Sequence, residues 1–326
     1  MKLKKRLKIV FIIVLIAIVT GFIGISGVLG YQVANQLSYQ NVSKNTIEAS
    51  IMQLKSWGKT IDYYEENYEH KTMFLENEKG YQIPYTIIGD TKLKEKDTVI
   101  LVHGAGGDYR SVYPHAEFYV QQGYNVVAID QRASGLSKDN IVSFGYYEKY
   151  DLKDMVDFIT EMLPQQKIIL HGFSMGAATV ALYGEMVGEK ESILLMVLDS
   201  SYESMQYIFA KVWEGMDTGL PSSYAVFCGN IFLKTKFGYS FDDVNVIKAF
   251  ERCKIPVLFF QGMNDDLTTP DRGKNLYEHS AAIQKEYVEQ ECGHIEGFVK
   301  HPKEYKKRVL EFIDEIRIDS YCEKKG

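Results

Sequence analysis

A five-residue segment with glycine at both ends and serine in the middle constrains this chain more than any other feature. The segment Gly172-Phe173-Ser174-Met175-Gly176 follows the apolar run 167–171 and precedes the small-residue run 177–182, so a buried strand should pass directly into a helix. A turn this sharp strains its central residue, and glycine two positions to either side avoids a clash with the neighbouring chain. The strain would lift the Ser174 hydroxyl clear of the sheet, near the first free N–H groups of the new helix. Ser174 is therefore the candidate nucleophile.

A nucleophilic serine needs a base, and the base needs an acid that orients it. The strand-like run 256–260 leads into a loop that carries Asp265, and His294 follows a second short run over 285–288. Both residues would then lie on loops that follow strands. The chain order is Ser174, Asp265, His294, which is neither the chymotrypsin order nor the subtilisin order.

Other residues compete for these two roles. Asp266 is adjacent to Asp265, and Asp199 and Asp130 each end a predicted strand. We expect Asp199 to cap the turn that follows it, and Asp130 to fix its loop through hydrogen bonds and an ion pair with Arg132. Two further histidines that precede glycines at strand ends are expected to be structural, namely His103 and His171. Asp265 is the preferred acid, with Asp266 and Asp199 left open.

Five motifs in this order resemble those of the α/β-hydrolase superfamily. The resemblance covers the chain from about Lys71 to its C-terminus and is strongest toward the membrane-associated esterase and lysophospholipase-like branch related to prolyl-oligopeptidase-type serine hydrolases. The motifs are Leu101-Val102-His103-Gly104-Ala105-Gly106-Gly107, Asp130-Gln131-Arg132-Ala133-Ser134-Gly135-Leu136-Ser137, His171-Gly172-Phe173-Ser174-Met175-Gly176-Ala177-Ala178, Gly262-Met263-Asn264-Asp265 and Gly293-His294.

The resemblance implies an α/β fold with a mostly parallel central sheet, helices on both faces and a helical lid. Backbone N–H groups that meet the developing oxyanion can lower the barrier by about 3–4 kcal/mol each. Met175, the residue after the nucleophile, should supply one, and the resemblance places the second on Ala105. Two departures stand out: Ala133 occupies a position where glycine is usual, and the acid loop is one residue longer before Pro270.

Other chemistries lack their sequence signatures. A dinucleotide-binding fingerprint would need glycine where Tyr109 stands, and no phosphate loop with Gly-Lys-Ser/Thr is present. The histidines show no ligand spacing, and Asp242-Asp243 is interpreted as a turn or helix start rather than a metal site. The four cysteines, Cys228, Cys253, Cys292 and Cys322, have no CxxC spacing. We therefore expect no cofactor and no metal.

The N-terminus predicts a membrane anchor. Residues 9–30 carry no charge and no proline, and a run of about 20 apolar residues can cross a bilayer, whereas a signal-peptide core has about 7–15. Five basic residues precede the run and orient it with the N-terminus in the cytoplasm; they are Lys2, Lys4, Lys5, Arg6 and Lys8. The net charge of −6 would be more negative without them, so a nucleic-acid partner is not expected.

The chain divides into four predicted parts: a basic cytoplasmic tail (1–8), a transmembrane anchor (9–30), a partly helical stalk (31–70) and a hydrolase domain (71–326). A hairpin is predicted to start the sheet, over 72–76 and 81–88, followed by strands at 98–102, 125–129, 167–171, 193–198, 256–260 and 285–288. Helices are predicted at about 109–122, 147–163, 175–187 and 302–316. The alternation stops over about 203–250, where an aromatic-rich insertion is predicted to form the lid.

These features predict a membrane-tethered serine hydrolase, of the carboxylesterase or lipase kind, that cleaves a small-molecule ester or a thioester. Its domain would lie outside the cell membrane. Two other functions stay open. A serine peptidase acting on short peptides would need an element that recognises the amino end of its substrate, and the chain has no convincing acidic pair for that role. A catalytically inactive, membrane-tethered binding protein would keep the fold without the reaction.

Overall fold

The computed structural model describes residues 2–41 and 45–323 and contains one eight-stranded sheet. The strand order is β1-β2-β4-β3-β5-β6-β7-β8, and every pairing from β4 onward along this order is parallel. The β1–β2 and β2–β4 pairings are antiparallel, so the predicted hairpin start is confirmed. The strands are β1 (His70–Glu76), β2 (Gln82–Ile88), β3 (Thr98–Val102), β4 (Asn125–Ile129), β5 (Ile168–Phe173), β6 (Ile193–Asp199), β7 (Val257–Gly262) and β8 (Lys285–Gln290).

The central strands are continuous apolar runs because the sheet is covered on both faces. Every residue of β3, β4, β5, β6 and β7 is buried. A strand of a parallel sheet that is covered on both sides needs apolar residues at successive positions rather than at alternate ones. This is why the short apolar runs in the sequence predicted the strands to within two residues at each end.

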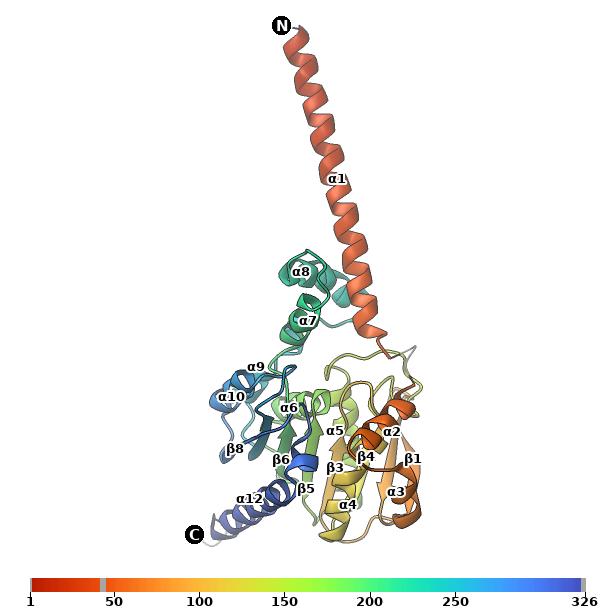
Figure 1. Cartoon of the computed structure of the whole chain (residues 1–326), viewed down its shortest axis with the longest axis vertical. Helices are drawn as coiled ribbons and strands as arrows, with labels where there is room; N and C mark the ends of the chain where they lie inside the picture. Colours follow the sequence, from red (N-terminus) through yellow and green to blue (C-terminus); the bar gives the residue numbers. More distant parts are fainter. Residues whose placement is uncertain (1, 42–44, 324–326) are drawn as a thin grey trace.

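Helices pack on the two faces of the sheet (Figure 1). One core joins the sheet to α5 (Glu148–Met162) and α6 (Met175–Val187), and the helical stripe of Leu152, Met155, Val156 and Ile159 on α5 is buried in it. The other core joins it to α4 (Tyr113–Gln121) and α12 (Pro302–Glu323). The predicted helix over 109–122 begins as a 3-10 turn, η1 (Tyr109–Val112), and α12 extends beyond its predicted end. Two shorter helices complete the body, α10 (Pro270–His279) and α11 (Gly297–Lys300).

The N-terminal part of the chain forms three helices. Helix α1 (Lys2–Ser38) has 37 residues, continues past residue 30 and projects away from the sheet (Figure 1). It is long and apolar enough to cross a membrane, and its large apolar side chains from Leu7 to Ile25 are exposed. Helices α2 (Thr46–Ser56) and α3 (Ile61–Asn67) instead pack on the body through the buried side chains of Leu54 and Tyr64.

The predicted insertion between β6 and β7 is helical. It contains α7 (Met205–Glu214), α8 (Ser222–Phe232), a π-helical turn η2 (Leu233–Phe237), a 3-10 turn η3 (Phe241–Asp243) and α9 (Val246–Phe250). Helices α7 and α8 rise on the same side of the body as α1, and α8 lies beside α1 (Figure 1). The insertion therefore lies next to the apolar N-terminal helix.

Candidate active site

The turn between β5 and α6 has the strained geometry that its sequence predicted. Ser174 has φ +51° and ψ −114°, and its N–H donates to the carbonyl oxygen of Asp199 at 2.8 Å. The two glycines are needed because the chain packs so closely here. A Cβ on Gly172 would overlap the carbonyl oxygen of Gly176, and a Cβ on Gly176 would overlap that of Val102 on β3. Close packing on both sides of the turn therefore holds Ser174 in its strained conformation.

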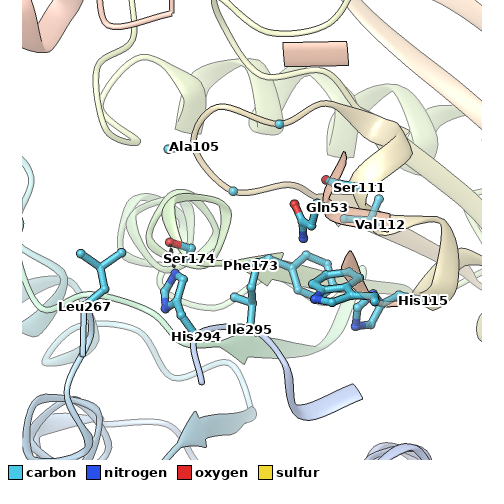
Figure 2. Close-up of a pocket in the computed structure, with 13 residues that line it drawn as sticks. Gln53, Ala105, Ser111, Val112, His115, Phe173, Ser174, Leu267, His294 and Ile295 are labelled. Carbon is cyan, nitrogen blue, oxygen red and sulfur yellow. Dashed lines mark hydrogen bonds between the residues drawn. The ribbon is translucent and has the colours of Figure 1, made fainter. Parts of the chain in front are cut away.

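The structure brings Ser174, His294 and Asp265 together. The His294 Nε2 atom lies 2.9 Å from the Ser174 Oγ, and Nδ1 lies 2.7 Å from Oδ2 of Asp265 (Figure 2 shows the first pair). The loop that carries His294 is itself fixed, because the Ile295 N–H donates to Ser200 Oγ and the Gly293 N–H donates to Glu296 Oε2. Residues that are 120 and 29 positions apart thus form one chain of hydrogen bonds.

Asp265 is buried and held by four donors. Its Oδ1 accepts from the N–H groups of Leu267 and Thr268, at 2.9 and 2.8 Å. Its Oδ2 accepts from the Thr268 hydroxyl at 2.7 Å and faces His294. Burial raises the pKa of Asp265, but the hydrogen bonds and charge of His294 and the bonds from Thr268 outweigh it and lower the pKa below its ordinary value. The neighbouring Asp266 is exposed and does not share these donors.

The two rival carboxylates at strand ends are engaged elsewhere. Asp199 accepts from the hydroxyls of Ser200 (2.9 Å) and Tyr305 (3.0 Å), and burial raises its pKa to about 6. Asp130 accepts from the N–H groups of Tyr109 and Leu136, and burial raises its pKa to about 7.

The expected ion pair between Asp130 and Arg132 is wrong. Arg132 instead makes a bidentate pair with Asp151, at 2.6 and 2.8 Å, and a third bond to Asp139. Its neighbour Ala133 has φ +54°, a conformation that costs an L-residue about 1 kcal/mol and that glycine adopts freely. Ala133 therefore adopts the positive φ that favours glycine, although glycine is absent from this position.

Three other histidines of the body, His103, His115 and His171, are buried. His103 accepts from the Gln131 N–H through Nε2, and His171 lies between the hydroxyls of Tyr119 and Tyr305. Burial lowers the pKa of both. His115 is also buried, with its pKa lowered to about 3, and neither of its nitrogens has a partner among the described residues. Among these rings, His294 alone contacts Ser174.

The predicted oxyanion-hole residues belong to two segments that meet near Ser174, the start of α6 and the loop after β3. Met175 is the first residue of α6, so its N–H belongs to the first helical turn, where no intrahelical acceptor exists. Ala105 lies on the exposed loop after β3 (Figure 2). This loop approaches the turn closely, since a Cβ on Gly104 would lie 3.4 Å from the Cβ of Ser174.

A cavity of about 170 Å³ opens beside Ser174 and His294. Its lining is mostly apolar, with Val112, Phe173, Leu267 and Ile295 among the lining residues (Figure 2). Gln53 and Trp57, from α2 and its C-terminal cap, close one side of it. Sequence reasoning missed these two residues, because helical spacing in the segment indicated packing but not a site. Within the described residues, the lining contains no residue of the insertion.

Metal-ligating residues do not cluster in the described ranges: no group of three or more His, Cys, Asp or Glu side chains could hold an ion. Cys228, Cys253 and Cys292 are free and buried, and the side chain of Cys322 lies outside the described part of the structure. Burial, reinforced by Asp199 and Glu296, raises the pKa of Cys292 to about 12. This thiol is therefore un-ionised at neutral pH, as expected of a packing residue.

The sheet order, the strained serine between β5 and α6 and the loops at the ends of the parallel strands define an α/β-hydrolase fold. The family model described as the alpha/beta hydrolase fold matches residues 97–226. The predicted fold class is confirmed, and the comparisons support membership of the α/β-hydrolase superfamily. The narrower resemblance to the prolyl-oligopeptidase-related branch stays a prediction.

Particular proteins are similar over longer stretches. The esterase Pf2001 of Pyrococcus furiosus is 26% identical, with a TM-score of 0.61 over 80% of this chain and 95% of that one. The uncharacterized protein YqkD of Bacillus subtilis (strain 168) is 26% identical over 225 residues, which are 68% of this chain and 72% of YqkD. A membrane phospholipase A shares the fold, with 15% identity and a TM-score of 0.58 over 95% of this chain and 98% of that one. The esterase of Pyrococcus furiosus supports the coarse prediction of an ester hydrolase, whereas the phospholipase, at 15% identity, shows the fold alone.

Proposed function

We propose that this protein is a serine hydrolase that cleaves carboxylic ester or thioester bonds through an acyl-enzyme. The observation that carries the proposal is the pair of hydrogen bonds that links Asp265 to His294 and His294 to Ser174 at the mouth of a cavity. Nucleophile, base and orienting acid are then within hydrogen-bond distance of one another, as nucleophilic catalysis requires. The similarity to the esterase of Pyrococcus furiosus supports the same reaction class.

In this mechanism the Ser174 Oγ attacks the carbonyl carbon while His294 Nε2 takes its proton. Asp265 accepts from Nδ1 and so keeps the proton of the neutral ring there, which leaves Nε2 free to act as a base. When the tetrahedral intermediate collapses, His294 returns the proton to the leaving alcohol or thiol, and Ser174 is left acylated. Water activated by His294 then attacks the acyl group, releasing the acid and restoring the serine.

The charge that develops on the carbonyl oxygen would be met by the backbone N–H groups of Met175 and Ala105. Met175 begins a 13-residue helix, so the helix dipole adds to its N–H in stabilising negative charge. The glycines around Ala105 let the loop after β3 bring its backbone toward the substrate. Both proposed donors are backbone groups, so no side chain has to be positioned to supply them.

We further propose that residues 9–30 anchor the protein in the cell membrane, with tail 1–8 in the cytoplasm and domain 71–326 outside. The exposed apolar surface of α1 supports the anchoring, and the basic residues at its N-terminal end support the orientation. Cell fractionation should recover the intact chain with the membranes, and protease added outside whole cells should digest its C-terminal domain. A soluble form that starts after residue 30 would show instead that α1 is a cleaved signal sequence.

The catalytic proposal is tested by labelling the purified full-length protein with a fluorophosphonate probe and measuring hydrolysis of p-nitrophenyl acetate. Ser174→Ala should abolish labelling and lower turnover by more than 10³-fold, because a methyl group cannot attack the carbonyl. Ser137→Ala, which changes a loop serine outside the cavity, is the matched control and should keep both. Turnover within tenfold of the parent in Ser174→Ala, at an unchanged melting temperature, would refute the serine mechanism.

A further inference from the structure

Helix α8 of the insertion is fixed against the apolar helix α1. The Tyr224 ring stacks on Phe22 with centroids 6.0 Å apart, and its hydroxyl lies 2.6 Å from Ser26 Oγ. Just over two turns further along both helices, Phe232 meets Tyr31 edge to face, also at 6.0 Å. The two helices therefore run side by side in the same direction from about Phe22 to Tyr31.

Small residues bring the two backbones close together in this contact. A Cβ on Gly30 would overlap the carbonyl oxygen of Cys228, and a Cβ on Gly229 would lie 2.6 Å from the Val33 side chain. Interfaces in which glycine allows backbones to approach are typical of helices that pack within membranes. Because the contact has no room to slide, the position of α1 in a membrane also sets the position of α8.

The depth of α8 follows from the register of this contact. Phe22 precedes Gly30 by eight residues, which is about 12 Å along a helix. If residues 9–30 span the bilayer, Tyr224 lies beside the last turns of the span rather than beyond them. The loop before α8, residues 215–221, lies nearer still to the N-terminal end of α1 (Figure 1). At the other end of the contact, the Lys236 ammonium donates to Asn35 Oδ1 and marks the aqueous side.

The insertion exposes large apolar side chains in this region, which water would solvate poorly. On α8, Phe227 is 67% exposed and Ile231 is 52% exposed. Three more exposed apolar side chains lie on α7 and on the loop between α7 and α8, namely Val212 (46%), Met216 (58%) and Leu220 (45%). The same region carries the exposed charges Lys211, Glu214 and Asp217. A mixture of large apolar and charged side chains suits the boundary between headgroups and acyl chains, and not the centre of a bilayer.

We propose that α8 and the loop before it, continuous with α1, form a second membrane-contacting surface that inserts into the headgroup and acyl boundary of the outer leaflet. The partner is the lipid bilayer itself. The inference rests on the proposed anchoring by residues 9–30. In this arrangement the insertion holds the hydrolase domain against the membrane surface in a fixed orientation, and the domain does not move independently of the membrane anchor.

The test places a fluorophore at position 227 of the full-length protein reconstituted in phosphatidylcholine vesicles. Phe227→Cys is labelled with an environment-sensitive dye, with the parent chain measuring background labelling of its native cysteines. Ile283→Cys is the matched control, because Ile283 is equally exposed at 64% but precedes β8 on the body. Lipids with a nitroxide on the acyl chain should quench position 227 at least threefold more than position 283, and iodide should show the reverse order.

Three other results would overturn the proposal, and they separate its parts. Flotation of the vesicles is measured first, and protein that does not float refutes the anchoring together with the inference. Protein that floats but shows equal iodide quenching at positions 227 and 283 refutes the inference alone. Protection of position 227 from both quenchers, with cross-linked dimers, would assign the surface to a second copy of the chain. Hydrolysis of a water-soluble ester in the same samples reports on the catalytic proposal independently.

Discussion

Replacing Asp265 by asparagine should disable His294 through the two backbone donors that hold the other carboxylate oxygen. In the parent, Oδ1 accepts from the N–H groups of Leu267 and Thr268, and Oδ2 faces His294. An asparagine oxygen must stay with the two N–H donors, so its NH₂ group turns toward the imidazole. His294 Nδ1 would then have to accept, which moves the ring proton to Nε2. A protonated Nε2 cannot take the proton of Ser174.

The expected loss of turnover follows from the free energy needed to hold the asparagine side chain in the opposite orientation. Turning the asparagine so that its oxygen again faces His294 leaves two buried N–H donors opposite an NH₂ group, at about 1–3 kcal/mol each. The productive tautomer of His294 is present only in the fraction of molecules with this orientation, which is roughly 2–6 kcal/mol higher in free energy. At about 1.4 kcal/mol for each factor of ten, turnover should fall by about 30-fold to about 10⁴-fold. The upper end equals the loss known for the equivalent change in a serine protease.

The assay is the initial rate on p-nitrophenyl acetate at saturating concentration, with circular dichroism and melting temperature as checks on folding. Asp266→Asn is the matched control, because Asp266 is exposed and lies one residue away. It should keep turnover within about threefold of the parent. If Asp266→Asn or Asp199→Asn causes the large loss while Asp265→Asn stays near the parent, the assignment of the acid is wrong.

Three further changes test other parts of the site. Trp57→Ala should raise KM for a hydrophobic ester by about tenfold, because it removes an apolar wall of the cavity; no change relative to the exposed Met52→Ala would exclude α2 from binding. Asp199 has its pKa raised to about 6 by burial, so its contribution to stability is present below pH 4 and is lost as pH rises to 6. Asp199→Asn should therefore gain melting temperature relative to the parent between pH 4.5 and pH 8, and a constant difference would refute this. Gly176→Ala should lower stability by about 1–3 kcal/mol in urea unfolding, because its Cβ meets the Val102 carbonyl; an unchanged midpoint would show that the turn relaxes.

Much of the fold could be predicted because the central strands carry local signals. A strand buried on both faces needs four to seven consecutive apolar residues, and those runs are visible in the sequence. The turn at Ser174 was also visible in the sequence, because its two glycines, which are required by steric limits, lie within a segment of five residues. The Asp130–Arg132 pair was predicted wrongly, because a bidentate partner 19 residues away, Asp151, offers Arg132 a better geometry than the neighbouring carboxylate.

The sequence by itself determined the alternating strands and helices, the strained serine, the order of the three candidate catalytic residues and the long apolar helix at the N-terminus. Each depends on neighbours within one turn, one strand or one helix. Only the tertiary structure decided that Asp265 rather than Asp266 faces His294, since both have the same chemistry and differ in where the loop folds. It also decided that Trp57 closes the cavity and that α8 lies against α1. These contacts join segments far apart in the chain, and packing in three dimensions, which no local pattern encodes, selects them.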